Sequence, residues 1–187
     1  ELRSACVAGA WFSTVSTALQ VMLIALVLSP ASLRAIAPSM GSALAMALAL
    51  GLAAFSRIEA PAQDGNMNGR AFSLWQSIGL ALLLSSITAV VAWIQGAFGT
   101  LATFAATALA GFADMHSPST AAITLAAHGG IDAATMLTAV LLAFSTNSVS
   151  KIAAAYAAGG TRFGTTVSLG LVAVVAAAWL PWWLLRP

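Results

Sequence analysis

Charged side chains are almost absent from this sequence. Of its 187 residues, 6% are Asp, Glu, Lys or Arg and 60% are hydrophobic. A water-soluble domain carries about 25% charged residues, so this composition excludes an ordinary soluble domain. The seven basic residues are scattered along the chain, which leaves no basic patch for nucleic acid. We therefore expect no nucleic-acid partner.

Cysteine is nearly absent as well. The single cysteine, Cys6, excludes an internal disulfide, and no Cys or His pair has zinc-finger spacing. The chain also lacks the Gly-x-Ser-x-Gly, His-Glu-x-x-His and paired-aspartate motifs of hydrolases. We expect no enzymatic activity and no covalent cofactor. The chain begins at Glu1 without a methionine, and we interpret it as the later part of a longer polypeptide.

Long apolar runs make up most of the sequence. They are continuous, without the period-2 alternation of a membrane barrel, and this favours helices. The predicted fold class is all-α, a polytopic transmembrane helical bundle of about six spans with one broken or re-entrant helix. We expect a multi-pass protein of the bacterial inner membrane. Its expected partners are the lipid bilayer and either a second copy of the chain, as a homodimer, or the remainder of a longer chain.

The runs divide the chain into three parts. Residues 1–56 hold two predicted spans, and residues 57–70 are the one extended polar stretch, which predicts an exposed loop. Residues 71–187 hold the remaining spans, including a broken helix over 100–128 and an unusually polar helix over 133–158. The part after the loop is long enough to cross a bilayer more than once.

Two patterns concern the arrangement of these spans. The motif Phe-Ser-Thr-x-Ser occurs at 12–16 and again at 144–148, which suggests an internal repeat whose first copy is incomplete. With six crossings, arginines 3, 57, 70 and 186 fall at one membrane face and Arg34 and Arg162 at the other. Because basic residues favour the cytoplasmic side, this count places the 57–70 loop in the cytoplasm.

The region 100–128 is too long for one span. A straight helix of this length measures about 43 Å, whereas the hydrocarbon core is about 30 Å thick. Pro118 also removes a backbone donor near its middle. We predict half-helices over 100–113 and 118–128, joined by an irregular segment at 114–117. The alternative is a re-entrant hairpin with both outer ends on one side of the membrane.

Ionisable side chains near this break predict a site, because such groups are expensive inside a membrane. The predicted ion-binding residues are Asp114, His116, Ser117, Thr124, Asn147 and Lys151. Of these, Asp114, His116 and Asn147 are the predicted metal ligands, since carboxylate, imidazole and amide groups suit a borderline divalent ion such as Zn²⁺, Mn²⁺, Co²⁺ or Ni²⁺. Two alternatives are a purely structural hydrogen-bonded cluster and an ion pair between Asp114 and Lys151.

Residues 111–126 and 145–151 together resemble a known domain. The resemblance is to the bacterial multi-pass membrane domain of unknown function found in MgtC/SapB-like proteins, over about residues 70–187. Its pattern is Gly-Leu-x-Asp-x-Asp-Ala-Ile-Thr-Leu, followed by small-x-x-Asn-x-x-x-Lys. Asp114, Thr124, Asn147 and Lys151 match this pattern, whereas His116 stands where the family has a second acidic residue. The resemblance implies a membrane location and ion transport.

These observations lead to a predicted function. The chain is interpreted as a transporter or permease domain whose substrate is a small divalent metal cation. In this interpretation Lys151 tunes the charge of the site. The alternative is a non-transporting membrane module whose polar cluster is structural or docks a partner subunit.

Overall fold

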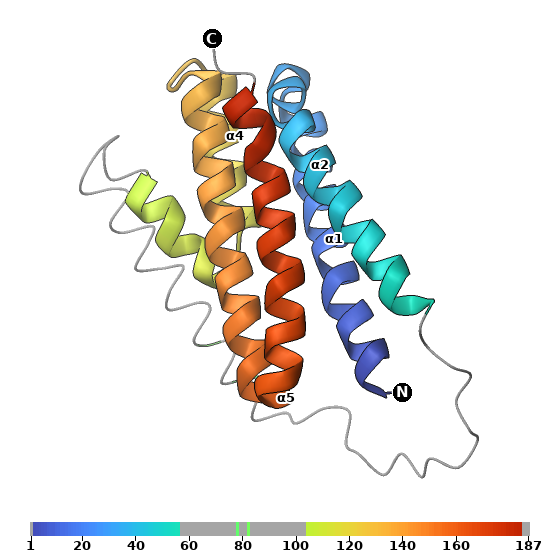
Figure 1. Cartoon of the computed structure of the whole chain (residues 1–187). Helices are drawn as coiled ribbons and strands as arrows, with labels where there is room; N and C mark the ends of the chain where they lie inside the picture. The colour runs from blue at the N-terminus through green and yellow to red at the C-terminus, as the bar shows by residue number, and fades with distance from the viewer. Residues whose placement is uncertain (1, 57–77, 79–81, 83–103, 185–187) are drawn as a thin grey trace.

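The computed structural model describes residues 2–56, 78, 82 and 104–184, and its regular structure is helical throughout (Figure 1). The labelled helices are α1 (Leu2–Leu28), α2 (Pro30–Phe55), α4 (His116–Ala127) and α5 (Ala133–Leu184), and a short apolar helix, Phe104–Ala113, precedes α4. Within the described residues, α1, α2 and α5 are long and apolar enough to cross a membrane. The all-α prediction is confirmed. The number of about six spans stays a prediction, because the expected third span lies mostly outside the described residues.

A tight turn joins α1 to α2 into an antiparallel hairpin. Ser29 caps α2, and its hydroxyl oxygen accepts the amide of Ser32 at 3.2 Å. Pro30 occupies the first turn of α2, where its missing donor costs no helical hydrogen bond. The hairpin supplies two neighbouring helices against which the rest of the chain packs.

Helix α5 is folded back on itself at a glycine. It contains 52 residues, which would extend for about 78 Å if straight. Gly160 has a φ of 70°, a conformation that favours glycine, and reverses the chain there. The first arm (133–159) and the second arm (161–184) run antiparallel, because Trp179 Nε1 donates to Ser145 Oγ at 3.0 Å. Figure 1 shows the two arms side by side.

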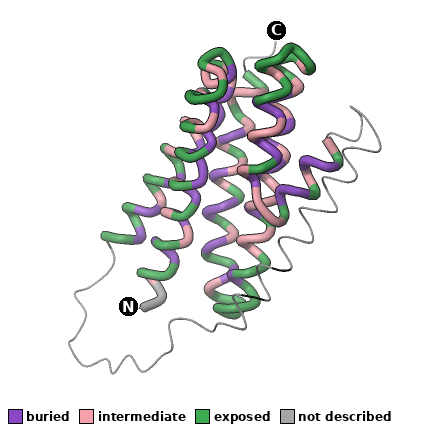
Figure 2. The backbone as a smooth tube through the Cα atoms, turned by 180° about the vertical axis from the view of Figure 1, so that it is seen from behind, coloured by how far each residue is buried: buried purple, intermediate pink, exposed green. Residues whose placement is uncertain are grey.

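The break between the half-helices was predicted at residues 114–117. In the structure it comprises only residues 114–115, between the helix Phe104–Ala113 and the start of α4, because the hydrogen bonds to Asp114 begin α4 at His116. Gly111 packs against the first arm of α5, since a Cβ there would lie 2.6 Å from the carbonyl oxygen of Ala143. Ser150 Oγ on the same arm donates to the Phe112 carbonyl at 2.7 Å. Figures 1 and 2 show the outer ends of both half-helices at the same end of the bundle. The two half-helices therefore form a hairpin with its vertex near mid-height, and this favours the re-entrant alternative over a broken crossing.

Because residues 104–127 form a hairpin, the arginines are distributed between the two ends of the bundle differently from the prediction. Ser4 of α1 and Arg162 of α5 line one pocket, so the start of α1 and the turn of α5 lie at the same end of the bundle. The prediction that Arg3 and Arg162 lie at opposite membrane faces is wrong. The physical reason is that residues 104–127 return to the end where they began, which removes one crossing from the count.

The interior of the bundle consists mainly of small and apolar side chains, and its outer surface is also apolar. Buried alanines allow close helix packing around Met40, Met115 and Phe144, each fully buried. Large apolar side chains also face outward, with Val27 82% and Leu169 70% exposed. Figure 2 shows exposed and buried residues alternating along every helix. An apolar exterior on long helices supports contact with a lipid bilayer.

Candidate functional site

The carboxylate of Asp114 caps the N-terminus of α4. Its Oδ1 accepts the His116 amide at 3.0 Å, and its Oδ2 accepts the Ser117 amide at 3.0 Å and the Ser117 hydroxyl at 2.8 Å. His116 Nδ1 lies 2.7 Å from Oδ1. The carboxylate thus has four partners, all within three residues of it in sequence. It satisfies amides at a helix start that have no partner within the helix itself.

The same contact fixes the chemistry of His116. An ionised carboxylate only accepts hydrogen bonds, so Nδ1 carries the hydrogen in this pair. In the neutral ring the lone pair then resides on Nε2. This atom is buried and has no hydrogen-bond partner among the described residues. The ring therefore presents one unpartnered nitrogen to the interior of the bundle.

Ser119 adds a second unpartnered polar atom. It lies three residues after His116, on the same face of α4. Its side chain is fully buried, and its Oγ has no partner in the part of the chain that the structure describes. Most helical hydroxyls bond back to their own helix, as Thr120 does to the His116 carbonyl at 2.7 Å. The prediction missed Ser119, although its spacing from His116 was a usable signal.

Lys151 lies on the first arm of α5 and points to α1. Its Nζ donates to Thr17 Oγ1 at 3.1 Å and to Thr14 Oγ1 at 3.4 Å. Thr17 in turn donates its own hydrogen to the Ser13 carbonyl at 2.8 Å, which leaves oxygen lone pairs for the amine. Within the described residues no carboxylate lies within 4.0 Å of Nζ, and the ion pair there joins Asp114 and His116. The alternative of an Asp114–Lys151 ion pair is therefore wrong.

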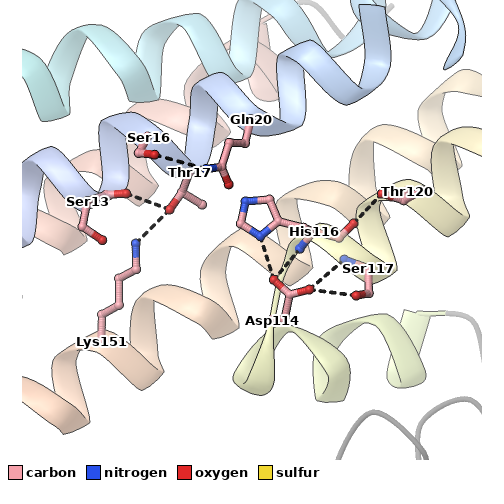
Figure 3. A network of polar contacts seen from close by, with 9 residues as sticks. All are labelled: Ser13, Ser16, Thr17, Gln20, Asp114, His116, Ser117, Thr120 and Lys151. Carbon is pink, nitrogen blue, oxygen red and sulfur yellow. Dashed lines mark hydrogen bonds and ion pairs between the residues drawn. The ribbon is translucent and has the colours of Figure 1, made fainter. Parts of the chain in front are cut away.

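Helix α1 supplies a polar face between these two groups. In Figure 3 the imidazole of His116 lies between the Asp114 carboxylate and α1, on the side of Gln20. Gln20 Nε2 donates to Ser16 Oγ at 3.3 Å, so its amide oxygen remains available. One turn away on α1, Thr17 holds Lys151. We call His116, Ser119, Gln20 and Lys151, together with Asp114, the interior polar site. Ser119 is buried in it, Asp114, His116 and Lys151 are half-buried, and Gln20 lies at its exposed edge.

The remaining predicted residues are dispersed. Ser117 lies in the site as a partner of Asp114. Thr124 lies eight residues beyond His116, about 12 Å along α4, and its side chain is exposed. Asn147 lies one turn before Lys151, is half-buried, and makes no side-chain hydrogen bond to any described residue. The structure therefore gathers Asp114, His116 and Ser117 and leaves Thr124 apart from them.

The donor set for a cation contains one imidazole. Within the described residues there is no group of three or more His, Cys, Asp or Glu side chains that would hold a metal ion. A binding position at His116 Nε2 would be completed by hydroxyl or amide oxygens. Such a set suits brief and reversible binding better than a permanent structural metal, which usually has four protein ligands.

Long apolar helices with large apolar side chains on their outer surface define the class as a helical multi-pass membrane protein. The chain belongs to the family described as Domain of unknown function (DUF4010), whose model matches residues 1–159. No curated protein and no solved structure matches the chain. The match provides no link to MgtC/SapB-like proteins. It also covers the first 56 residues, where the resemblance extended only to hydropathy. It ends before the second arm of α5.

Proposed function

We propose that this domain transports a small divalent metal cation, as substrate, across the bacterial inner membrane through the interior polar site. The role is non-enzymatic. One observation carries the proposal: His116 Nε2 is buried, without a partner among the described residues, and turned inward by the hydrogen bond between Nδ1 and Asp114. Metal-binding histidines characteristically donate their other ring hydrogen to a carboxylate, which holds the ring and raises its basicity.

The charges around His116 favour a cation. The N-terminus of α4 carries about half a positive elementary charge, which by itself repels a metal ion. The carboxylate of Asp114 offsets this charge, since it accepts the amides of His116 and Ser117 directly. In this proposal Asp114 positions the imidazole and supplies negative charge instead of coordinating the ion.

Oxygen donors would complete the coordination. Ser119 Oγ is buried with no partner in the described part of the chain, and the amide oxygen of Gln20 lies on the facing helix (Figure 3). Imidazole with neutral oxygen ligands favours Zn²⁺, Mn²⁺, Co²⁺ or Ni²⁺ over Mg²⁺, which prefers oxygen ligands and water.

Lys151 gives the site a second charge. It lies on the same side of α1 as His116, farther along the helix, where Thr14 and Thr17 accept its hydrogen bonds (Figure 3). A fixed positive charge in a low-dielectric interior weakens the binding of a cation nearby, which helps the ion to leave. We propose this tuning role for Lys151, and an auxiliary oxygen-donor role for Asn147 one turn away.

Flux into proteoliposomes tests the proposal. The wild-type protein is expected to pass at least one of Zn²⁺, Mn²⁺, Co²⁺ and Ni²⁺. Flux in His116→Ala is expected to fall at least about tenfold, the factor that loss of an oriented metal ligand or its supporting carboxylate typically produces. His128→Ala is the matched control, because His128 is exposed at the far end of α4. Absence of wild-type flux across the panel, or unchanged flux in His116→Ala, contradicts the proposal.

A structural module is the second candidate. It is favoured by the four hydrogen bonds of Asp114, all of which are local and serve to start α4. In this case the cluster only locks the re-entrant hairpin or docks a partner subunit. Added metal would then leave the thermal stability of the wild type unchanged, whereas a transported cation stabilises the folded state by mass action.

A further inference from the structure

A pocket of 490 Å³ lies at the end of the bundle where α1 begins, α2 ends and α5 turns back. This volume lies within the range of small-ligand sites. We call it the Arg162 pocket. Its lining residues are Ser4, Val7, Trp11, Leu50, Ala53, Ala54, Arg162 and Thr166. It is separate from the interior polar site, because none of its lining residues takes part in that site.

The lining of the Arg162 pocket is divided into a polar and an apolar part. Arg162 and Thr166 are four residues apart and share a face of the second arm of α5. Thr166 Oγ1 donates its hydrogen to the Arg162 carbonyl at 3.0 Å, so the Arg162 guanidinium is the hydrogen-bond donor that this arm offers to a ligand. The walls from α1 and α2 are mainly apolar, with Trp11 and Val7 buried and Leu50 half-buried, and Ser4 at the start of α1 adds one hydroxyl. A ligand that matches both parts is an amphiphile.

The charge of Arg162 selects an anionic headgroup. The guanidinium is exposed, and no carboxylate lies within 4.0 Å of it among the described residues. Helix ends of a membrane bundle lie at the level of the lipid headgroups, where arginine is a common anchor. Basic pockets between transmembrane helices bind the phosphates of anionic lipids.

We propose that the Arg162 pocket binds an anionic phospholipid, with the phosphate on Arg162 and an acyl chain along Val7, Trp11 and Leu50. A free phosphate ion matches the charge but leaves the apolar walls uncovered. The apolar area therefore assigns the phosphate to a lipid. This inference does not depend on whether the domain transports a cation.

Native mass spectrometry of the full chain in detergent tests the proposal. The protein is titrated with dioleoylphosphatidylglycerol or, as the neutral comparison, dioleoylphosphatidylcholine. Phosphatidylglycerol is expected to bind wild type more tightly. Arg162→Gln is expected to weaken this binding about fivefold, which corresponds to about 1 kcal/mol per basic residue near an anionic headgroup. Arg162→Lys should keep most of it.

Two further variants separate the pocket from general electrostatics. Arg34→Gln removes an exposed arginine of α2 at the opposite end of the bundle and should leave binding unchanged. Ala53→Trp fills the apolar wall without changing charge and should weaken binding as Arg162→Gln does. Equal loss in Arg34→Gln, no loss in Arg162→Gln or Ala53→Trp, or displacement of the lipid by equimolar inorganic phosphate would each overturn the proposal.

Discussion

His116 Nδ1 lies 2.7 Å from Oδ1 of Asp114, and the same carboxylate accepts the amides of His116 and Ser117 at the start of α4. One side chain therefore both begins the helix and sets the ring orientation of the histidine. Because the two tasks share the same oxygens, a change at Asp114 alters the stability of the hairpin and the chemistry of the site together. Variants that separate the two effects are the most informative.

Asp114→Ala removes the cap of α4. We expect it to lower the free energy of unfolding by about 1–2 kcal/mol, the usual cost of losing a capping oxygen. Asp114→Asn keeps one carbonyl oxygen and should lose less. Thermal unfolding in detergent, with Ser117→Ala as the control that removes a hydroxyl and keeps the carboxylate, measures the difference. Equal stability of Asp114→Ala and wild type would show that the carboxylate does not support the helix start.

Lys151 and Thr17 should be energetically coupled. Thr17→Val removes the closer acceptor of the amine, so we expect it to destabilise the protein by about 1 kcal/mol while Lys151 is present. In a Lys151→Met background the same change should cost little, because the long apolar side chain needs no acceptor. A double-mutant cycle measures the coupling. Additive losses would mean that the two side chains do not interact.

Gly111 should tolerate no side chain. A Cβ there would lie 2.6 Å from the Ala143 carbonyl oxygen, so we expect Gly111→Ala to destabilise by about 1–3 kcal/mol through overpacking. Gly41 in α2 is the matched control, since nothing lies within 4 Å of the position that a Cβ would take there. Gly41→Ala should stabilise by about 0.5–1 kcal/mol. Equal effects at both glycines would refute close packing of the half-helix on α5.

The stabilisation that the Asp132 carboxylate gives to the start of α5 should be lost at acid pH. It lies outside the spans, and the Thr135 amide, which donates to its Oδ1 at 2.6 Å, lowers the pKa of its carboxyl below the ordinary 3.8. Because the folded-state pKa is the lower one, the stabilisation is full above the ordinary pKa and is lost as pH falls through the folded-state value. The difference in Tm between wild type and Asp132→Asn should therefore shrink between about pH 6 and pH 3. A difference independent of pH would contradict this role.

Local features of the fold were predictable, whereas features set by packing were not. Pro118 and the excessive length of 100–128 predicted a broken helix, and Asp132 lies directly before α5, because caps and breaks depend on neighbouring residues. Whether the chain re-enters depends on contacts such as that of Gly111 with Ala143, which are 32 residues apart in sequence. The predicted placement of Arg3 and Arg162 at opposite faces was wrong because it assumed that residues 100–128 cross the membrane.

The candidate site divides in the same way. Asp114, His116 and Ser117 were predicted together, since they are adjacent in sequence and lie at the break. The partners of Lys151 were not, because Thr14 and Thr17 reach it from a helix more than 130 residues away in sequence. Thr124 was included from the family pattern, and its place on α4 separates it from the break.

The most direct test of the account is the state of the His116 ring itself. The chain has two histidines, so His128→Gln, purified without a polyhistidine tag and labelled with ¹⁵N in its imidazole, reports on His116 alone. We predict an Nδ1–H tautomer, with the Nε2 resonance shifting when Zn²⁺ or a similar borderline divalent ion is added. An Nε2–H tautomer, or a spectrum unchanged by every metal of the panel, would contradict it.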